Sequence, residues 1–313
     1  MSLIEQAAQR LEQLRQAGVD MPPQSADEVA ETAIDEQALP LRNDESRPAT
    51  SSGEQVVIQS PEMAISRRVE LDLQVLSAAG IIRPDAPRST LADEFRVIKR
   101  PLIDNAMGKG ATQIENGNLI MITSALPGEG KTYTATNLAM SIAMELDNTV
   151  MLVDADVARP NLLKRLGVPP ARGLMDVLVD ESIELSQVLL RTNVEKLTIL
   201  PSGTPHPRAT ELLASDAMIN LLADMANRYS DRIIIFDSPP LLVTTEARTL
   251  AARMGQVVIV VKAEGTAHAD VRHALATLET CPVKLMLLNQ ARAATKDSYG
   301  YGYGYGYGYG YGK

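Results

Sequence analysis

From about residue 117 the sequence alternates between short apolar runs and segments with helical periodicity, and this alternation limits the fold more than any other feature. Amphipathic stretches of helix length lie at 131–146, 209–228 and 267–279. The apolar runs around them are NLIMITSA, TVMLVDAD, KLTILPSG, DRIIIFDSPP, QVVIVVKAEG and VKLMLLNQ. Near-continuous aliphatic strands separated by helices are typical of a parallel sheet that is buried on both faces. The sequence therefore predicts an α/β domain over residues 117–292.

Four further segments flank this domain. Residues 1–19 predict an amphipathic helix, for which a docking or coiled-coil role and a membrane-surface role both stay open. Residues 20–60 are rich in Asp, Glu, Pro, Ser and Gln, which predicts a disordered acidic linker. Residues 61–116 predict a helical lead-in, with an amphipathic stretch at 62–79 and the segment TLADEFRVIKRPLIDNA helical at least as far as its proline. Residues 293–313 form a separate tail.

The overall charge and the cysteine count exclude several classes of protein. The net charge of −9 and a pI near 5.0 argue against a general nucleic-acid binder, which needs a basic face. A single cysteine, Cys281, excludes an intramolecular disulfide and fits a reducing compartment. No apolar run approaches the roughly 18–20 residues that span a bilayer, and the N-terminus lacks an apolar signal-peptide core. We therefore expect a cytoplasmic protein without a transmembrane segment of its own.

The first apolar run leads into SALPGEGKTYTATNLAMSIA, where a strand, a glycine-rich loop and a helix are expected in succession. This is the context of a phosphate-binding loop, in which backbone N–H groups and the helix N-terminus face phosphates. Lys131 would bridge the β- and γ-phosphates and Thr132 would ligate Mg²⁺. The strict pattern has glycine at position 125, where this chain has Ala125. The predicted ATP-binding residues are Pro127, Gly128, Glu129, Gly130, Lys131, Thr132 and Tyr133.

Aspartates follow two other apolar runs. VDADVARP places Asp154 and Asp156 at the C-terminal end of one predicted strand, and IIIFDSPP places Asp237 at the end of another. Open α/β sheets bind ligands at this edge, and acidic groups there are costly unless they face a cation. Capping of the following helix is the alternative explanation for the aspartate pair. The three motifs together predict a site for Mg²⁺ and a nucleoside triphosphate.

The C-terminal tail has a composition of its own. It ends in GYGYGYGYGYGYGK, in a chain with nine tyrosines, two phenylalanines and no tryptophan. Alternating glycine has a high backbone entropy, so packing does not explain the repeat. Either the tail is a disordered low-complexity segment, or its hydroxyl groups are presented on a flexible chain.

These motifs resemble the Walker A, Walker A′ and Walker B elements of the bacterial tyrosine kinases, a P-loop family related to the partition and division-site ATPases. GLMDVL at 173–178 and PSGTPHPRATELLAS at 201–215 are similar to two further segments of that family, and the resemblance covers roughly residues 90–311. It is strongest toward autokinases encoded with exopolysaccharide loci that also carry an exosortase system. The resemblance implies a partition-ATPase-like P-loop fold and ATP-dependent tyrosine autophosphorylation that regulates exopolysaccharide biosynthesis or export.

The resemblance also assigns roles to individual residues. In this family a C-terminal tyrosine cluster is phosphorylated in trans by a neighbouring subunit, so it implies that the tail tyrosines accept phosphate. We expect Asp154 to remove the tyrosine proton, Lys131 to stabilise the transferring phosphoryl group, and Thr132, Asp156 and Asp237 to arrange Mg²⁺. Asn289 occupies a position at which related ATPases recognise adenine, although a strand-end turn would explain it as well. The expected phosphoacceptors are Tyr299, Tyr301, Tyr303, Tyr305, Tyr307, Tyr309 and Tyr311.

The chain departs from the family pattern at two places. The arginine expected two residues after the second aspartate is Ala158 here, and Arg159 follows it. The oligomerisation helix of the family carries Glu-x-x-Arg-x-x-Arg, where this chain has Asp93, Arg96 and Lys99. These residues keep the charges but not the bidentate reach of arginine. Assembly into a ring-like homo-oligomer through this helix is expected, with an exposed charged helix face as the alternative.

Two other functional classes remain as alternatives. A partition-type ATPase switch would use hydrolysis to control dimerisation or membrane attachment, but that class carries an additional lysine early in its phosphate loop, and SALPGEGKT has none before Lys131. A scaffold that binds nucleotide without turnover would not need the complete set of lysine and aspartates. The resemblance further implies a membrane-embedded activator of the polysaccharide co-polymerase type, which would recruit the chain to the inner face of the cytoplasmic membrane. His268 and His273 are five residues apart and predict surface positions rather than a metal site.

Overall fold

A computed structural model of the chain describes residues 66–86, 88–110, 112–228 and 231–291. The predicted N-terminal helix (1–19), the acidic linker (20–60) and the tyrosine-rich tail (293–313) lie outside these residues. The fold below is therefore that of the P-loop domain together with most of the predicted lead-in.

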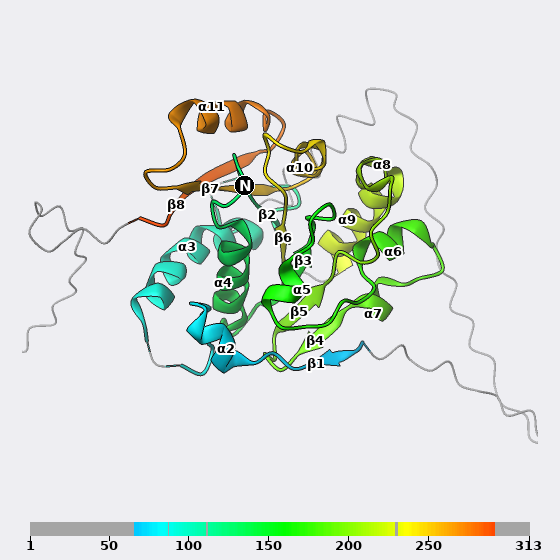
Figure 1. Ribbon diagram of the computed structural model, residues 1–313, viewed down its shortest axis with the longest axis horizontal. Coiled ribbons are helices and arrows are strands. Elements are labelled where there is room, and N and C mark those ends of the chain that lie inside the picture. Colours follow the sequence, from blue (N-terminus) through cyan, green and yellow to red (C-terminus); the bar gives the residue numbers. More distant parts are fainter. Residues whose placement is uncertain (1–65, 87, 111, 229–230, 292–313) are drawn as a thin grey trace, which may run out of the picture. The chain divides into compact units, whose positions relative to one another are not determined.

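An eight-stranded sheet forms the centre of the domain, with the strand order β1-β4-β5-β3-β6-β2-β7-β8 (Figure 1). β4 and β5 are antiparallel, and every other neighbouring pair is parallel, as the sequence predicted. The strands are β1 (Arg68–Val69), β2 (Leu119–Ser124), β3 (Thr149–Asp154), β4 (Leu190–Thr192), β5 (Leu197–Leu200), β6 (Arg232–Asp237), β7 (Gln256–Lys262) and β8 (Val283–Asn289).

All six predicted apolar runs form strands, namely β2, β3, β5, β6, β7 and β8. The two strands that the sequence analysis missed, β1 and β4, have two and three residues. A strand that short has no readable periodicity, so only its pairing in the folded chain identifies it.

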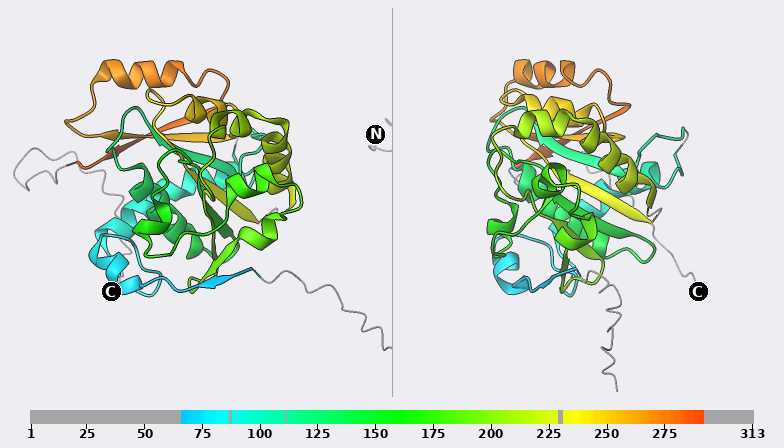
Figure 2. Two further views of the ribbon diagram at one scale, coloured as in Figure 1. Left: turned by 45° about the vertical axis from the view of Figure 1, so that its right-hand side comes forward. Right: turned by 90° about the vertical axis from the view of Figure 1, so that its right-hand side faces the viewer.

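Helices cover both faces of the sheet (Figure 2). The face with α2, α3 and α4 holds one cluster of buried side chains, and the face with α8 to α11 holds the other. The helices are α2 (Leu73–Ala78), α3 (Thr90–Ala106), α4 (Lys131–Ala143), α5 (Leu162–Arg165), α6 (Leu174–Val179), α7 (Leu185–Val188), α8 (Ala209–Ala214), α9 (Asp216–Arg228), α10 (Thr245–Ala251) and α11 (His268–Ala276).

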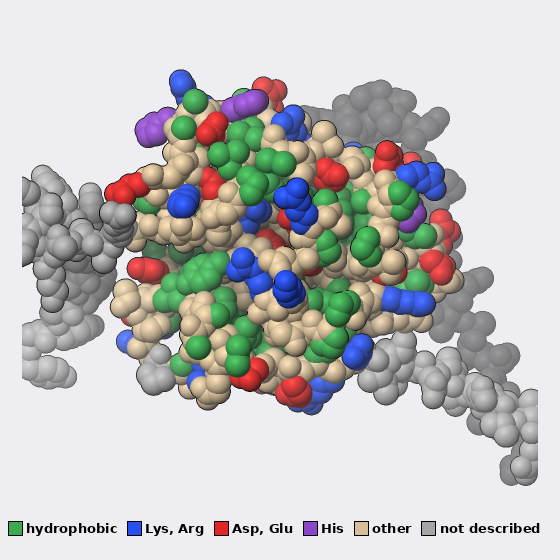
Figure 3. Space-filling model, viewed as in Figure 1, with side chains coloured by type: hydrophobic (Ala, Val, Ile, Leu, Met, Phe, Trp, Pro, Cys, Tyr) green, Lys and Arg blue, Asp and Glu red, His purple; other side chains and the backbone are tan. Residues whose placement is uncertain are grey.

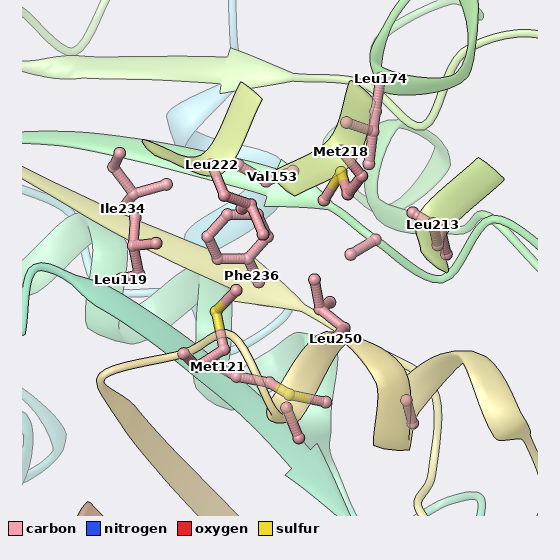
Figure 4. Packing of buried hydrophobic residues seen from close by; sticks show 14 of the residues in the cluster. Leu119, Met121, Val153, Leu174, Leu213, Met218, Leu222, Ile234, Phe236 and Leu250 are labelled. Atoms are coloured by element: carbon pink, nitrogen blue, oxygen red, sulfur yellow. The ribbon is translucent and has the colours of Figure 1, made fainter. Parts of the chain in front are cut away.

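The two clusters take alternate residues of the same strands. On β6, Ile233 and Ile235 face the α3–α4 side, whereas Ile234 and Phe236 face the opposite side. Phe236 lies among side chains from the neighbouring strands and from α9 and α10 (Figure 4). Since side chains alternate along a strand, a strand buried on both faces must be apolar throughout. Each such side chain stabilises the fold by about 1.5–3 kcal/mol relative to exposure.

Of three helical predictions, the second below is confirmed and the other two differ from the structure in their bounds. The stretch predicted as one helix at 62–79 gives β1 and then α2, which begins where the Asp72 side chain accepts hydrogen bonds from Gln74 N and Val75 N. α3 continues through Pro101 to Ala106. The predicted helix at 209–228 is interrupted at Ser215, whose extended backbone separates α8 from α9.

Candidate functional site

The phosphate-binding loop connects β2 to α4, so strand, loop and helix follow one another as the motif requires. Gly128 and Gly130 have φ values of 84° and 99°, a left-handed conformation that favours glycine. Gly130 is also the N-cap of α4, and a Cβ atom there would overlap the side-chain amide of Asn289. α4 begins at Lys131 and Thr132, and its N-terminus faces the site.

Asp154 and Asp237 end the neighbouring strands β3 and β6 and are direct partners in the sheet register. Both are only 2% exposed. Asp154 Oδ2 accepts a hydrogen bond from Leu162 N at 3.1 Å. Within the described part of the chain, the Oδ1 atoms of both aspartates are buried without a hydrogen-bond partner. Two buried acceptors at one strand edge indicate a site built to face a donor or a cation.

Burial sets the electrostatics of the site. It raises the pKa of Asp154 and of Asp237 to about 7, and the proximity of other carboxylates adds to the rise. The pKa of Asp156 is also raised, mainly by burial. Burial lowers the pKa of Lys131, although the charges of Asp237, Asp156 and Glu129 oppose this change. A divalent cation bound here would compensate the carboxylates and favour their ionised forms.

A cavity of about 600 Å³ opens in front of these groups. Asp156 and Asp237 line it, whereas Asp154 is not among its lining residues. Three basic side chains, Lys131, Arg159 and Arg165, line it as well. Lys and Arg side chains gather near the middle of the face seen in Figure 3. The full lining is Gly128, Gly130, Lys131, Thr132, Tyr133, Asp156, Arg159, Asn161, Arg165, Asp237, Asn289 and Gln290.

A larger cavity of about 990 Å³ lies at the opposite edge of the sheet, around residues 112–116, 252–254 and 280–283. It has neither the phosphate loop nor a cluster of charges. We therefore place the candidate functional site in the smaller cavity, where a positive helix terminus, a lysine and the buried carboxylate of Asp237 meet.

The residues around the expected metal position suit a cation that takes some of its ligands from the phosphate groups of the nucleotide. Among the described residues, no cluster of three or more His, Cys, Asp or Glu side chains is arranged to hold a metal. Mg²⁺ is commonly bound through one or two carboxylates together with phosphate oxygens. Thr132 and the free oxygen of Asp237 supply that kind of partial site.

The end of β8 braces the phosphate loop. Asn289 Nδ2 donates to the carbonyl of Glu129 at 2.9 Å, and Gln290 Nε2 donates to the carbonyl of Gly128 at 3.3 Å. The side chain of Asn289, which we expected to contact adenine, thus lines the cavity while bonded to the loop backbone. Gln290 was not predicted, because no local motif marks a residue whose partner is so distant in the chain.

The buried carboxylate of Glu129 adds a second brace. Its Oε2 accepts a hydrogen bond from Leu126 N at 2.7 Å, and its Oε1 accepts one from the hydroxyl of Thr266. Thr266 lies between β7 and α11, so the loop is fixed to two neighbouring segments of the domain. The motif predicted that Glu129 would belong to the ATP site but gave no indication of this partner.

Arg159 takes up a position beside Asp156. Its backbone N–H donates to Asp156 Oδ1 at 3.1 Å, and the residue lines the cavity. Arg165 on α5 lines it as well, although no sequence motif singled it out. Both residues contribute positive charge where the resemblance implied one arginine.

The three predicted oligomerisation residues do not share one exposed face. Asp93 and Arg96 form an exposed ion pair with each other at 2.5 Å. Lys99 is only 4% exposed, and its Nζ lies 2.7 Å from Glu145 Oε1 and donates to the carbonyl of Ser141 at 2.6 Å. A signal for this was present, because Lys99 falls within the buried stripe of α3 formed by Phe95, Lys99, Leu102 and Ile103.

The two additional segments that carry the resemblance meet in the structure. Asp176 Oδ2 accepts hydrogen bonds from Gly173 N at 2.8 Å and from Thr204 N at 3.0 Å. Leu174 N and Met175 N donate to the carbonyls of Pro201 and Ser202. These hydrogen bonds join the two segments to each other.

None of the helices in the described part of the chain is both long enough and apolar enough to cross a membrane. His268 and His273 lie on α11 and are exposed, as predicted.

Known proteins resemble this chain over its P-loop domain. The model of a family described as an AAA domain matches residues 117–289. The tyrosine-protein kinase YwqD of Bacillus subtilis is 31% identical over 222 residues, which cover 70% of this chain and 90% of that protein. The putative tyrosine-protein kinase EpsB of Ralstonia nicotianae is 33% identical over 176 residues, 56% of this chain but only 23% of that protein.

Among solved structures, the chimeric protein CapA2B2 is similar with a TM-score of 0.56 and 26% identity, covering 71% of this chain and 93% of that chain. The kinase domain of VpsO is similar with a TM-score of 0.52 and 26% identity, covering 62% and 94%. The P-loop fold implies binding of a nucleotide together with a divalent metal. With the motifs in place on this fold, the chain belongs to the bacterial tyrosine-protein kinase family.

Proposed function

We propose that this chain transfers the γ-phosphoryl group of Mg²⁺–ATP to the tyrosines of its own C-terminal repeat, in trans between subunits. The observation that carries the proposal is that Asp237 lines the cavity at the phosphate loop with a buried Oδ1 that has no hydrogen-bond partner among the described residues. Asp154, whose Oδ1 is in the same state, lies beside it in the sheet register. The repeat, with seven tyrosines in the last fifteen residues, supplies acceptors.

Each residue of the site would have its own role in phosphoryl transfer. Mg²⁺ would supply charge neutralisation at the phosphates. Thr132, Asp156 and Asp237 would hold it, and Lys131 would stabilise charge on the transferring group. Asp154 would take the proton of the tyrosine hydroxyl, whose oxygen then bonds to the γ-phosphorus while the bond to ADP breaks. A base works best with a pKa near the operating pH, and the buried Asp154 has a pKa of about 7.

The reach of the tail is compatible with transfer to a neighbour. Fourteen Gly-rich residues have an r.m.s. span of about 20 Å and a stretched length of about 50 Å. Phosphates added along them would carry roughly 1.5–2 negative charges each. Their mutual repulsion would favour separation of the subunits.

The wider role is part of the same proposal. Succinoglycan biosynthesis transport protein ExoP of Rhizobium meliloti, 34% identical over 181 residues, is named for polysaccharide transport, and the match spans 22% of its length. We propose that this chain regulates exopolysaccharide biosynthesis or export, as a ring-like homo-oligomer recruited to the cytoplasmic face of the membrane by an embedded activator. The predicted division into N-terminal helix, linker, lead-in, kinase domain and tail belongs to this proposal.

Intact-mass spectrometry tests the activity. Purified full-length protein is incubated with Mg²⁺–ATP beside Lys131→Met, a chain truncated after Ser298, and Lys164→Met as a matched control, because Lys164 is exposed and outside the cavity. We expect phosphate on wild type and on Lys164→Met only, with every added phosphate mapped to the tail. ATP hydrolysis without phosphate on the tail, with and without a co-purified membrane activator, would favour the ATPase switch instead.

A further inference from the structure

Strand β8 is an edge strand that pairs with β7 and has exposed apolar side chains. It is the last strand in the sheet order, and among the described residues no strand lies on its outer side (Figure 1). It has seven residues, of which Met286 and Leu288 are each 64% exposed. Edges of this kind readily pair with another strand, and folded proteins usually shorten, cover or charge them. The exposed side chains and free edge of β8 therefore indicate a surface that another strand could cover.

The side chains of β8 divide between the two faces of the sheet. Leu285 and Leu287 pack against the cluster under α3 and α4. Met286 and Leu288 lie on the other face, where α11 leaves a groove of about 520 Å³. The apolar part of this groove is Val261, Val271, Leu275, Met286 and Leu288. The groove can accept apolar side chains that stand on every second residue of an added strand.

The backbone of the same residues is turned to the free edge. Ala263 N donates to the carbonyl of Asn289 at 2.8 Å, so the polar groups of Asn289 point toward β7. Because these groups change sides from one residue to the next, those of Lys284, Met286 and Leu288 point away from β7. The residues that line the groove thus also offer hydrogen-bonding groups to an incoming strand.

We propose that the Tyr-Gly repeat, residues 299–311, pairs with β8 of its own chain as an antiparallel strand and lays its tyrosine rings over Met286 and Leu288. In an extended repeat of period two, all tyrosines stand on one face and all glycines on the other. Added strands bind through backbone hydrogen bonds, with alternate side chains giving specificity. Pairs of aromatic and aliphatic side chains across strands are favourable.

The position of the repeat in the chain supports pairing within one molecule. β8 ends at Asn289, and Gln290 has a φ of 58°, so the chain leaves the strand direction at once. The nine residues from 290 to 298 are enough to connect the two strands of a hairpin, and a short closed loop has a low entropic cost. A second copy outside the proposed oligomer would have to be bound at the full cost of association.

Docking of this kind would regulate the proposed kinase, and in that consequence the inference rests on the proposed function. A repeat held on β8 is withdrawn from the site of a neighbour, so autophosphorylation would be slower than with a free tail. Since ordering glycine is entropically costly, the docked strand would be weakly held and would exchange readily.

Hydrogen exchange without nucleotide tests the docking independently of any kinase activity. Full-length protein is compared with a chain truncated after Ser298, and exchange is followed in peptides covering 283–290. We expect β8 amides to exchange several-fold more slowly in the full-length chain, to the same extent at low and high protein concentration. Equal exchange in the two chains would overturn the inference. Protection that grows with protein concentration would overturn pairing within one chain, because a second copy then supplies the strand.

Substitutions test whether the tyrosine rings and the groove contribute to the protection of β8. Replacing all seven repeat tyrosines by phenylalanine should keep the protection, whereas replacing them by alanine should abolish it. Met286→Ser combined with Leu288→Ser should also abolish it and should raise the autophosphorylation rate several-fold. Val179→Ser, which changes another exposed apolar side chain on α6, should do neither. Protection that persists in the alanine repeat or in the groove variant would contradict the assignment of this surface.

Discussion

The side-chain amide of Asn289 donates a hydrogen bond to the backbone carbonyl of Glu129 across 2.9 Å. This bond joins the last residue of β8 to the phosphate loop, 160 positions earlier in the chain. It matters because the loop must hold its N–H groups toward phosphates before the nucleotide arrives. Pre-organisation of this kind lowers the cost of binding.

We predict that Asn289→Ala weakens nucleotide binding by about fivefold, the equivalent of one lost hydrogen bond of about 1 kcal/mol. If Asn289 acts by bracing the loop, ATP and GTP should lose affinity equally. If it recognises adenine, only ATP should lose affinity. Calorimetric titration with both nucleotides distinguishes these outcomes. Asn227→Ala, an exposed change on α9, is the control.

Glu129 offers a second test of the brace. Glu129→Ala leaves the partly buried Leu126 N–H and the Thr266 hydroxyl without their acceptor, so we expect the free energy of unfolding to fall by about 1–3 kcal/mol and ATP affinity to fall. Glu129→Gln keeps an acceptor oxygen and should be milder. Thr266→Val in a double-mutant cycle isolates the contact between the two side chains. Chemical denaturation of all four proteins measures it, and additive effects would exclude coupling.

The ion pair of Lys99 with Glu145 predicts a pH-dependent stability. Lys99→Met removes the partner of a carboxylate at the end of α4, and we expect a loss of about 2–4 kcal/mol at pH 7. Arg100 is 3.3 Å from the same carboxylate oxygen, but its side chain is 57% exposed. Arg100→Met is therefore a matched control that should cost less than about 1 kcal/mol.

The sign of the pH effect follows from the pKa of Glu145. Burial alone would raise this pKa, but the hydrogen bond and charge of Lys99, with help from Arg100 and Arg96, hold it below its ordinary value of 4.5. The pair therefore stabilises the fold above that ordinary value, and its contribution is lost as the pH falls through the pKa of the folded protein. Urea unfolding should show wild type and Lys99→Met converging as the pH drops below about 4.5. A constant difference down to the acid range would contradict this account.

The sequence predicted most of the sheet because buried parallel strands need apolar residues on both faces. It also predicted the positions of Lys131, Asp154 and Asp237, which lie at strand or helix ends where open α/β sheets bind ligands. It could not predict the braces from Thr266 and Gln290, because a contact between distant segments leaves no local pattern. Lys99, which we predicted to belong to an oligomerisation surface, is buried in the structure. Its spacing places it in an apolar stripe, where a charged residue is stable only with a partner such as Glu145.

From the burial of Asp237 we predict that its carboxylate lowers the stability of the folded, metal-free protein. The pKa of Asp237 is raised from 3.8 to about 7, mainly by burial. A raised pKa means that the folded state loses stability as the pH rises through this range, because the ionised form is disfavoured. Asp237→Asn cannot ionise, so in EDTA and without nucleotide we expect it to be more stable than wild type at pH 8, by on the order of 2 kcal/mol. The gain should shrink as the pH falls toward 4, and metal-dependent ATP binding should be lost. Thermal unfolding at pH 5 and pH 8 measures the effect, with Asp224→Asn on the exposed face of α9 as the control. A metal-free Asp237→Asn protein that melts below wild type at pH 8 would show that this carboxylate stabilises the fold through contacts of its own.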